Sequence, residues 1–540
     1  MTRDITILGG GLAGLTLALQ LRDQNPEASI TVLERRQLPV PISAHKVGES
    51  TVEIGAHYLA VTLGLKDHLD REHLQKYGLR LFFDADRCDD LAEAGELGAS
   101  HLLSLKSYQI DRGVLENHLA GRVRECGVEL LDGCTVRDFA PAVRTGPHRV
   151  RYRQAESENV IESRWVVDAM SRGSVIKRRL DLAEDNDHHG GSVWFRIADR
   201  IDIGQWSRDP RWRERCSQLP RWHSTNHLMG PGYWVWLIPL ASGSTSIGIV
   251  FDTRIHDFDQ LKSYEGTMAW LAQHQPLCHH AIEQTAGELQ DFLCLRRYSH
   301  GCRQVFSADR WALTGEAGVF LDPFYSPGSD FIAISNTYIC DLIRRDLAGS
   351  SIKRRARLYE RAFFSFYESS LNLYRDQYAL FGHARSMSAK TIWDYAYYWS
   401  VLALFVFAGR LTDLNFLARH GARLDELRRL NTQIQKMFRQ WAEAEEPIET
   451  AGLFINQSDL PLLVRLNREL GELVDDDDEQ LDQRMIRNAR QLHQLAAELG
   501  NLAPEHAAGI VELHAGSAEP DVELLTGLPA AMRSRALATA

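Results

Sequence analysis

The chain has 540 residues, of which 25% are charged and 44% are hydrophobic, and its formal net charge is −11. These values predict a globular protein with a large core and more than one structural unit, and the negative charge excludes the basic surface of a nucleic-acid-binding protein. None of the eight cysteines forms a C-x-x-C pair, which favours a reducing cytoplasm and gives no zinc motif or disulfide framework. We expect neither a signal peptide nor a transmembrane segment, since the longest apolar run, near 400–409, is far too short to span a bilayer.

The first expected elements form a βαβ unit around a glycine-rich turn. Residues 5–8 predict a short buried strand, and a helical pattern follows the turn. Gly9, Gly11 and Gly14 supply G-x-G-x-x-G, which lets a pyrophosphate approach the helix N-terminus. The next strand ends in Glu34, 20 residues after Gly14, where a carboxylate can bind ribose hydroxyls. This pattern predicts a dinucleotide site and leaves FAD and NAD both open.

Segments further along the chain favour FAD. Segment 109–119 predicts a polar strand end that runs into a helix, and segment 165–172 predicts a buried strand that ends in Asp168. Segment 311–323 predicts a strand, a Gly-Glu turn and a loop. A site assembled from segments this far apart resembles the FAD-binding fold of the aromatic hydroxylase superfamily. The resemblance implies that Arg112 lies near the flavin and that Gly315 and Glu316 meet its ribityl chain, with Glu316 standing where aspartate is usual. No second G-x-G-x-x-G follows, so we expect no separate NAD(P)H domain and a separate flavin reductase as partner.

Two further motifs narrow the resemblance. W-x-W-x-I-P occurs at Trp234, Trp236, Ile238 and Pro239, and F-x-x-P-x-x-S-x-G spans 320–328. With HKVGEST before them, these motifs resemble those of the flavin-dependent halogenases, of the tryptophan and phenol halogenase type, within the same superfamily. The resemblance covers roughly residues 1–350 and extends more loosely over the helical remainder.

The family resemblance implies a specific chemistry. In that family reduced flavin and O2 form a hydroperoxide, and a halide, chloride or bromide, attacks it to give hypohalous acid. A lysine then guides this oxidant to an electron-rich aromatic ring. Lys76 matches the catalytic lysine in type and context, because it leads a K-x-G segment, although Leu79 replaces the usual alanine. A surface lysine is the alternative for Lys76. Lys46, in the HKVGEST segment that belongs to flavin contacts in the family, is a weaker second candidate.

The resemblance also implies roles for the remaining site residues. Ser326, Gly328 and Ser329 are expected to bind halide, although Pro327 has no N–H to offer. Trp234, Trp236, Ile238 and Pro239 mark the family, and no metal site is expected. The residues implied to contact FAD are Gly9, Gly11, Leu12, Ala13, Gly14, Glu34, Arg35, Lys46, Gly48, Glu49, Ser50, Arg112, Gly315, Glu316, Pro323 and Gly328.

The leading prediction is an FADH2-dependent halogenase acting on a phenol-like ring, either free or carrier-bound. Tyr325 stands where tryptophan halogenases carry a glutamate, so free tryptophan is not the expected substrate. One alternative is an FAD-dependent aromatic monooxygenase on the same fold. Another is a non-catalytic flavin-binding partner of a biosynthetic assembly. A homodimer and a monomer both remain open.

The C-terminal part is expected to be mostly helical. From about residue 335, apolar residues recur at three- and four-residue spacing. Segment 391–411 is apolar on nearly all sides, which favours core packing over a substrate-pocket wall. The predicted fold class is therefore α/β: a Rossmann-type FAD-binding fold with an inserted β-sheet substrate region over 1–345. A helical extension over 346–540 follows, with a mobile tail from about 528.

Overall fold

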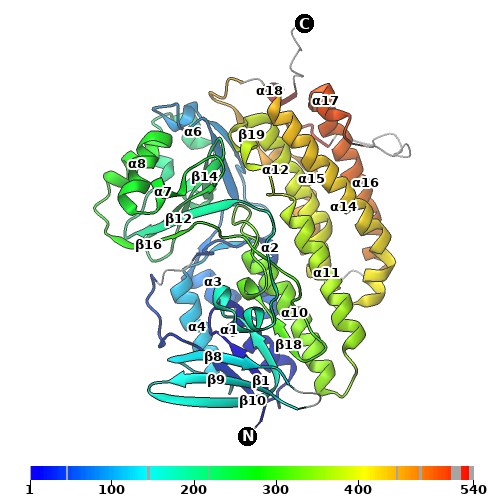
Figure 1. Ribbon diagram of the computed structural model, residues 1–540. Coiled ribbons are helices and arrows are strands. Elements are labelled where there is room, and N and C mark those ends of the chain that lie inside the picture. The colour runs from blue at the N-terminus through cyan, green and yellow to red at the C-terminus, as the bar shows by residue number, and fades with distance from the viewer. Residues whose placement is uncertain are drawn as a thin grey trace.

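The computed structural model describes residues 2–43, 47–142, 146–216, 218–445, 448–473, 477–511 and 524–533. In Figure 1 one β-sheet lies near the N-terminus and a second lies above it, while long helices from the C-terminal part run alongside both. The predicted fold class, a Rossmann-type α/β fold with an inserted β-sheet region and a helical C-terminal part, is confirmed. Among the described residues, no helix is long and apolar enough to cross a membrane.

The first sheet carries the glycine-rich turn at the end of its central strand. Its elements are β1 (Arg3–Leu8), β2 (Ile30–Leu33), β7 (Glu129–Leu131), β8 (Cys134–Ala140), β9 (His148–Gln154), β10 (Ser157–Asp168) and β18 (Trp311–Leu313), with helices α1 (Leu12–Gln24), α4 (Arg112–Glu125) and α10 (Gly328–Leu347). The strand order is β7-β2-β1-β10-β9-β8, and β18 joins the end of β10. β1 runs parallel to β2 and β10, and Ile5, Ile7 and Leu8 are fully buried, as expected for a strand covered on both faces.

The second sheet is inserted between the strands of the first. Its elements are β4 (Leu79–Phe83), β5 (Gly95–Gly98), β12 (Gly190–Ile197), β13 (Thr225–Gly230), β14 (Tyr233–Pro239), β15 (Thr245–Asp252), β16 (Leu289–Leu295) and β19 (Phe454–Asn456), with helices α6 (Pro210–Glu214), α7 (Phe258–Leu261), α8 (Tyr264–His274) and α9 (Pro276–Glu283). β14 holds W-x-W-x-I-P, and a Cβ at Gly248 of the neighbouring β15 would lie 2.2 Å from the Trp236 ring. Glycine at this cross-strand position therefore makes room for the indole.

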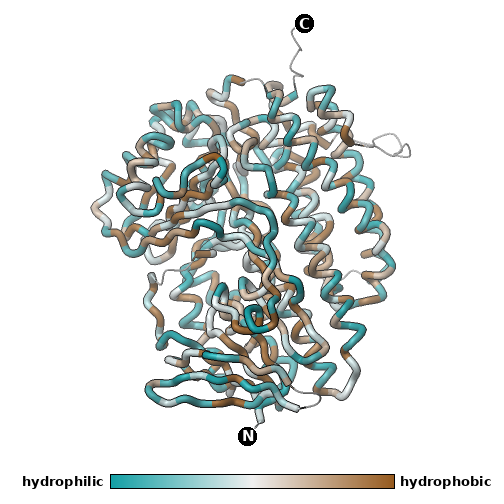
Figure 2. The backbone as a smooth tube through the Cα atoms, in the orientation of Figure 1, coloured by the Kyte–Doolittle hydropathy of each residue, from teal (hydrophilic) through white to brown (hydrophobic). Residues whose placement is uncertain are grey.

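The C-terminal helices pack side by side and also complete the second sheet. They are α11 (Lys353–Leu371), α12 (Ala384–Tyr398), α13 (Leu404–Phe407), α14 (Leu414–Glu443), α15 (Pro461–Gly471), α16 (Asp478–Leu502), α17 (Glu505–Ala508) and α18 (Ala530–Arg533). The long helices alternate hydrophilic and hydrophobic stretches along their length (Figure 2). β19, which lies between α14 and α15 in the chain, pairs in parallel with β5. The domain boundary that we propose near residue 345 falls at the end of α10, and part of the predicted tail from about 528 lies outside the described residues.

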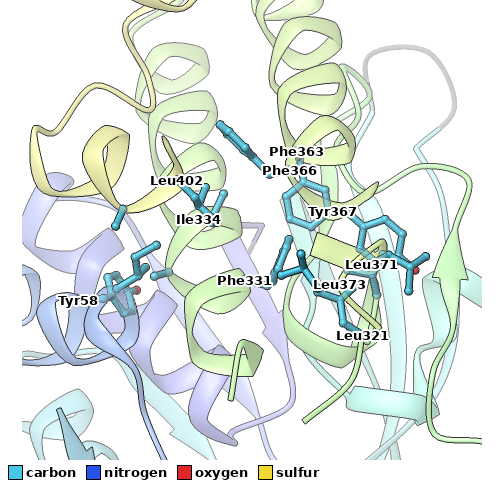
Figure 3. Packing of buried hydrophobic residues seen from close by; sticks show 14 of the residues in the cluster. Tyr58, Leu321, Phe331, Ile334, Phe363, Phe366, Tyr367, Leu371, Leu373 and Leu402 are labelled. Carbon is cyan, nitrogen blue, oxygen red and sulfur yellow. The ribbon is translucent and has the colours of Figure 1, made fainter. Parts of the chain in front are cut away.

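Aromatic packing fixes the start of α10, which follows directly after the 320–328 loop. Phe331 of α10 meets Phe363 of α11 edge-on, with ring centroids 5.7 Å apart. Figure 3 shows these residues together with Tyr367 and Leu371 of α11 in one buried cluster. Burying such aromatic side chains stabilises the contact by a few kcal/mol each, so the loop is attached to a rigid helix pair.

Candidate functional site

The turn after β1 is shaped to hold a group against the start of α1. Gly9 has a φ of +102°, and a Cβ at this position would lie 2.6 Å from the carbonyl oxygen of Ala169. A Cβ at Gly14 would lie 1.9 Å from the carbonyl oxygen of Gly9, so both positions require glycine. A Cβ at Gly11, by contrast, would meet no atom within 4 Å. The space in front of the helix N-terminus is therefore open to an anionic group.

Glu34 is held beside this turn, directly after β2. Its two carboxylate oxygens accept the backbone N–H of Gly10 at 2.6 Å and the backbone N–H of Arg36 at 2.8 Å. Each oxygen keeps a further lone pair that can accept a ribose hydroxyl. The position therefore suits the adenosine end of a dinucleotide.

A cavity of about 470 Å³, here called the main cavity, extends from the turn towards β14. Gly9, Gly14 and Glu34 do not line it, and Lys46 lies outside the described residues. The residues predicted to contact FAD that do line it are Gly11, Leu12, Ala13, Arg35, Gly48, Glu49, Ser50, Arg112, Gly315, Glu316, Pro323 and Gly328. Segments predicted from distant parts of the sequence thus meet at one cavity.

The other predicted residues divide between this lining and its surroundings. Trp234, Trp236 and Ile238 of the family motif line the main cavity, whereas Pro239 does not. The lining also includes Ser326 and Ser329, both predicted to bind halide. The indoles of Trp234 and Trp236 lie with their ring centroids 5.7 Å apart, and Trp236 donates its indole N–H to the Ser246 hydroxyl at 3.2 Å. The motif therefore forms an aromatic wall of the cavity.

The residues of the main cavity fit an FAD molecule. Its volume lies within the range of cofactor sites, and its walls combine apolar surface with a few fixed polar groups. Arg112 donates to the Val47 carbonyl at 2.7 Å and to Glu116 at 2.6 Å, which fixes the guanidinium at the edge of the cavity. Glu316 accepts the Ser171 hydroxyl at 2.5 Å, so the acid that replaces the usual aspartate is also anchored. Among the described residues, no group of His, Cys, Asp and Glu could hold a metal ion.

Lys76 is a buried amine rather than a surface lysine. Its Nζ donates to the Ser50 hydroxyl at 2.8 Å and to the Thr51 carbonyl at 2.9 Å, and only 3% of the residue is exposed. Burial lowers the pKa of Lys76 to about 8, although the neighbouring Glu53 and Asp330 act in the opposite direction. A substantial fraction of the amine is therefore neutral slightly above neutral pH.

A second cavity, here called the small cavity, measures about 50 Å³. Pro327 and Phe331 line both cavities, so the end of the 320–328 loop and the start of α10 separate them. Glu53 and Asp330, which both act on the Lys76 amine, line the small cavity, while its hydrogen-bond partner Ser50 lines the main one. Lys76 itself lines neither cavity, so these neighbours are what connect its amine to both.

The small cavity is too small for an aromatic ring in this conformation. A cavity of roughly 150 Å³ holds benzene, so a ring can enter a space of about 50 Å³ only if lining side chains move. Tyr325, Tyr374 and Tyr398 contribute to the lining, which gives the walls both aromatic surface and polar hydroxyls. In segment 391–411, which we considered as a possible pocket wall, Tyr398 lines the small cavity, whereas Trp393 and Phe405 belong to the core. Tyr395 also lines this cavity, although we had not singled it out.

The loop between the cavities is fastened through Asp322, a residue that the sequence motifs did not single out. Its Oδ2 accepts the Tyr298 hydroxyl, the Tyr378 hydroxyl at 2.6 Å and His188 Nε2 at 2.8 Å. Tyr378 in turn accepts the indole N–H of Trp234 at 3.2 Å. This network connects the loop to the W-x-W-x-I-P strand. In the sequence, the feature that could have pointed to Asp322 is an acidic residue between Leu321 and Pro323.

Ser329 offers an unused donor at the predicted halide position. Its hydroxyl is buried and has no hydrogen-bond partner among the described residues, and the residue lines the main cavity. Gly328 and Ser329 are the first residues of α10, so their backbone N–H groups are not used within the helix. An anion at this point would therefore find donors although Pro327 provides none.

Comparison with known proteins shows that the chain is similar to flavin-dependent halogenases over most of its length. It is 29% identical over 432 residues to the flavin-dependent halogenase chlA of Dictyostelium discoideum, covering 74% of this chain and 70% of that protein. It is 23% identical over 397 residues to the 1H-pyrrole-2-carbonyl peptidyl-carrier-protein chlorinase of Pseudomonas fluorescens, covering 69% of this chain and 83% of the chlorinase. Residues 7–86 also match the NAD(P)-binding Rossmann-like domain.

Solved structures agree on the fold. The halogenase PltM in complex with phloroglucinol and FAD aligns with a TM-score of 0.66 at 15% identity, covering 94% of this chain and 99% of PltM. The flavin-dependent brominase Bmp2 aligns with a TM-score of 0.58 at 20% identity, covering 82% of this chain and 98% of Bmp2. The resemblance to flavin-dependent halogenases that the motifs predicted is confirmed.

Proposed function

We propose that this relative of the flavin-dependent halogenases is itself an FADH2-dependent halogenase that acts on an electron-rich, phenol-like ring. The observation that carries the proposal is the place of Lys76. Its amine is buried, bonded to a residue of the main cavity and acted on by two acids of the small cavity. A flavin monooxygenase, which transfers oxygen directly, has no need of an amine between two cavities.

The residues divide the work between the two cavities. Bound reduced flavin, together with O2, supplies the oxidising equivalent that converts chloride or bromide into hypohalous acid. The glycine turn, Glu34 and Arg112 would hold the cofactor, and Ser326, Gly328 and Ser329 would hold the halide. Ser50 and the Thr51 carbonyl orient the Lys76 amine so that it can receive the oxidant and keep it from water. The aromatic substrate then meets the oxidant from the small cavity.

The loop supports a phenol-like substrate rather than free tryptophan. Tyr325 stands where tryptophan halogenases carry a glutamate, so the loop has no carboxylate at this position. The Tyr325 hydroxyl instead donates to Asp394 at 2.8 Å. The P. fluorescens relative is named for a carrier-bound pyrrole, and PltM was solved with phloroglucinol. We therefore propose a free or carrier-bound aromatic substrate.

The remaining partners follow from what the chain provides. The sequence has one G-x-G-x-x-G dinucleotide motif, so we propose that a separate flavin reductase supplies the reduced cofactor. All eight cysteines are free, which agrees with the proposed reducing cytoplasm. A homodimer remains part of the proposal.

One reaction tests the proposal. Purified protein is supplied with FAD, a flavin reductase, NADH, O2 and bromide, together with phloroglucinol and other phenols, and products are identified by mass spectrometry. We expect a brominated product that requires bromide. Hydroxylated product formed without any halide would instead support the monooxygenase alternative, and bound FAD without turnover would support the non-catalytic one.

We expect the two loop variants Ser329→Ala and Pro327→Ser to change halide use in opposite directions. Ser329→Ala removes a donor to an anion and should raise the KM for bromide by about tenfold, since a hydrogen bond to a charged group contributes about 1.5–3 kcal/mol. Pro327→Ser adds a backbone N–H and should lower that KM. Steady-state rates against bromide concentration measure both effects, and an unchanged KM in both variants would contradict the assigned halide site.

We expect the halogenation rate to rise with pH through about 8. The folded-state pKa of Lys76 lies below its ordinary value, so the amine is mostly protonated below pH 8 and mostly neutral above it. Only the neutral amine has a lone pair that can accept the halogen. Rates of single turnover between pH 6.5 and 9.5, started with pre-reduced flavin, measure this dependence. A rate that falls as pH increases would assign a hydrogen-bonding role to the ammonium form instead.

A further inference from the structure

Glu53 is a buried acid whose carboxylate is not fully used by the protein. It lies at the start of α2 (Glu53–His57), is only 9% exposed and lines the small cavity. Its Oε2 is buried and has no hydrogen-bond partner among the described residues. The nearby indole N–H of Trp399 favours the charged form of Glu53. This N–H, however, makes no hydrogen bond of normal geometry with any described residue. A buried acceptor without a donor costs free energy, so it is best explained by a ligand that supplies the donor.

The other two acids of the small cavity are already engaged. Asp330 accepts the Gly55 N–H at 2.8 Å and the Tyr398 hydroxyl at 2.8 Å, one on each oxygen. Asp394 accepts Lys390 Nζ and the Tyr325 hydroxyl on one oxygen, and the Gln435 side-chain amide on the other. Glu53 is therefore the acid in this lining with an oxygen left for a ligand.

The groups around Glu53 favour a role for its carboxylate as a proton acceptor. Burial raises the pKa of Glu53 above its ordinary value, and the Lys76 ammonium opposes this rise. Burial also raises the pKa of Asp330 to about 8, so this second acid is mostly neutral at pH 7 and repels Glu53 little. Tyr395 and Tyr398 also lie near enough for Glu53 to act on them electrostatically, and burial raises the pKa of both hydroxyls. An acid with a raised pKa is a stronger base than an exposed glutamate.

We infer that Glu53 binds the hydroxyl of a phenolic substrate and accepts its proton during halogenation. This inference rests on the proposed halogenase function and deepens it, because it names an ionisable ring hydroxyl as the required feature of the substrate. Lys76 and Glu53 lie close enough to interact electrostatically, so a ring bonded to Glu53 is brought to the amine that holds the oxidant.

The reaction balances with these groups. The hydroxyl proton moves to the Glu53 carboxylate, which leaves its electron pair on the oxygen and makes the ring carbons more nucleophilic. A ring carbon bonds to the halogen of hypohalous acid while the oxygen–halogen bond breaks and hydroxide leaves. Hydroxide takes the proton from the substituted carbon and becomes water. Glu53 then returns its proton to the phenolate oxygen.

Binding tests the inference without turnover. Protein loaded with FAD is titrated with 4-fluorophenol and with 4-fluoroanisole, which has no hydroxyl proton, and fluorine NMR reports both affinities. We expect the wild type to prefer the phenol by at least about tenfold, and Glu53→Leu to lose this preference. Glu360→Leu is the control, because Glu360 is partly buried but accepts Val305 and Phe306 N–H groups and lines neither cavity. A wild type that does not prefer the phenol overturns the inference.

Turnover separates the inference from the function on which it rests. We expect Glu53→Gln to slow bromination of phloroglucinol by about 100-fold, the usual effect of losing a general base. The same variant should form hypobromous acid at the wild-type rate when a small diketone traps it in the absence of phenol. Absence of trapped oxidant with the wild type would contradict the halogenase function itself. Normal trapping with unchanged phloroglucinol bromination in Glu53→Gln would contradict only the role of Glu53.

Discussion

Lys76→Met should abolish halogenation, with a loss of at least about 1,000-fold, while FAD still binds. Methionine keeps the length of the side chain but cannot hold hypohalous acid or accept the halogen. The oxidant formed in the main cavity would then escape, because no other described lysine contacts Ser50 or Thr51. Brominated product measured by mass spectrometry and FAD content measured by absorbance decide the result.

The same variant should be more stable than the wild type at neutral pH. The folded-state pKa of Lys76 is about 8, compared with an ordinary value of 10.5, so the buried ammonium costs stability below pH 8. This cost is of the order of 3 kcal/mol and disappears as pH rises through 10.5, where the unfolded chain also loses the proton. Lost hydrogen bonds to Ser50 and Thr51 reduce the gain to about 1–2 kcal/mol. A variant that is inactive because it is misfolded would show the opposite change in urea unfolding.

Lys66→Met provides the matched control. Lys66 is exposed and bonds Asp70 at 2.7 Å on the surface, four residues further along its helix. Such a pair contributes only a few tenths of a kcal/mol, so both activity and stability should stay close to those of the wild type. Retained bromination in Lys76→Met, with the control unchanged, would remove the main support for the proposed function.

Local motifs predicted the cofactor side of the site well, because its geometry is set by short-range backbone requirements. Gly9 and Gly14 are needed where the turn passes close to other backbone, and this demand appears in the sequence as G-x-G-x-x-G. The W-x-W-x-I-P strand likewise carries its two indoles to one face by simple alternation. These features can be recognised without knowing the fold.

The substrate side could not be predicted in the same way, because its properties come from long-range contacts. Glu53 resembles any surface acid at a helix start until α10 and α12 bury it. Its neighbour Asp330 bonds Gly55, which is 275 residues away in the chain. β19 is a three-residue strand in a region with a strong helical pattern, and it forms only because β5 offers a free edge. Such pairings depend on the completed tertiary structure.

Asp322→Ala should destabilise the protein by about 3–5 kcal/mol and weaken FAD binding. The Asp322 side chain is completely buried and accepts hydrogen bonds from His188, Tyr298 and Tyr378. Alanine removes the acceptor that these three groups share, and each group left unsatisfied costs about 1–3 kcal/mol before the structure relaxes. The Tyr298 and Tyr378 hydroxyls, 2.9 Å apart, can still bond each other and so limit the loss. Water entering the space would recover part of this cost, which places the expected loss at the lower end of the simple sum.

Asp322→Ala should also weaken FAD binding, because the hydrogen-bond network joins two walls of the main cavity. Tyr378 links Asp322 to Trp234, so removing the carboxylate frees the 320–328 loop from the tryptophan wall. Urea unfolding measures the stability, and flavin fluorescence measures the dissociation constant for FAD. Asp322→Asn keeps one acceptor oxygen and should lose roughly half as much stability. Equal unfolding free energies for wild type and Asp322→Ala would show that the loop is held by its packing on α10 and α11 instead.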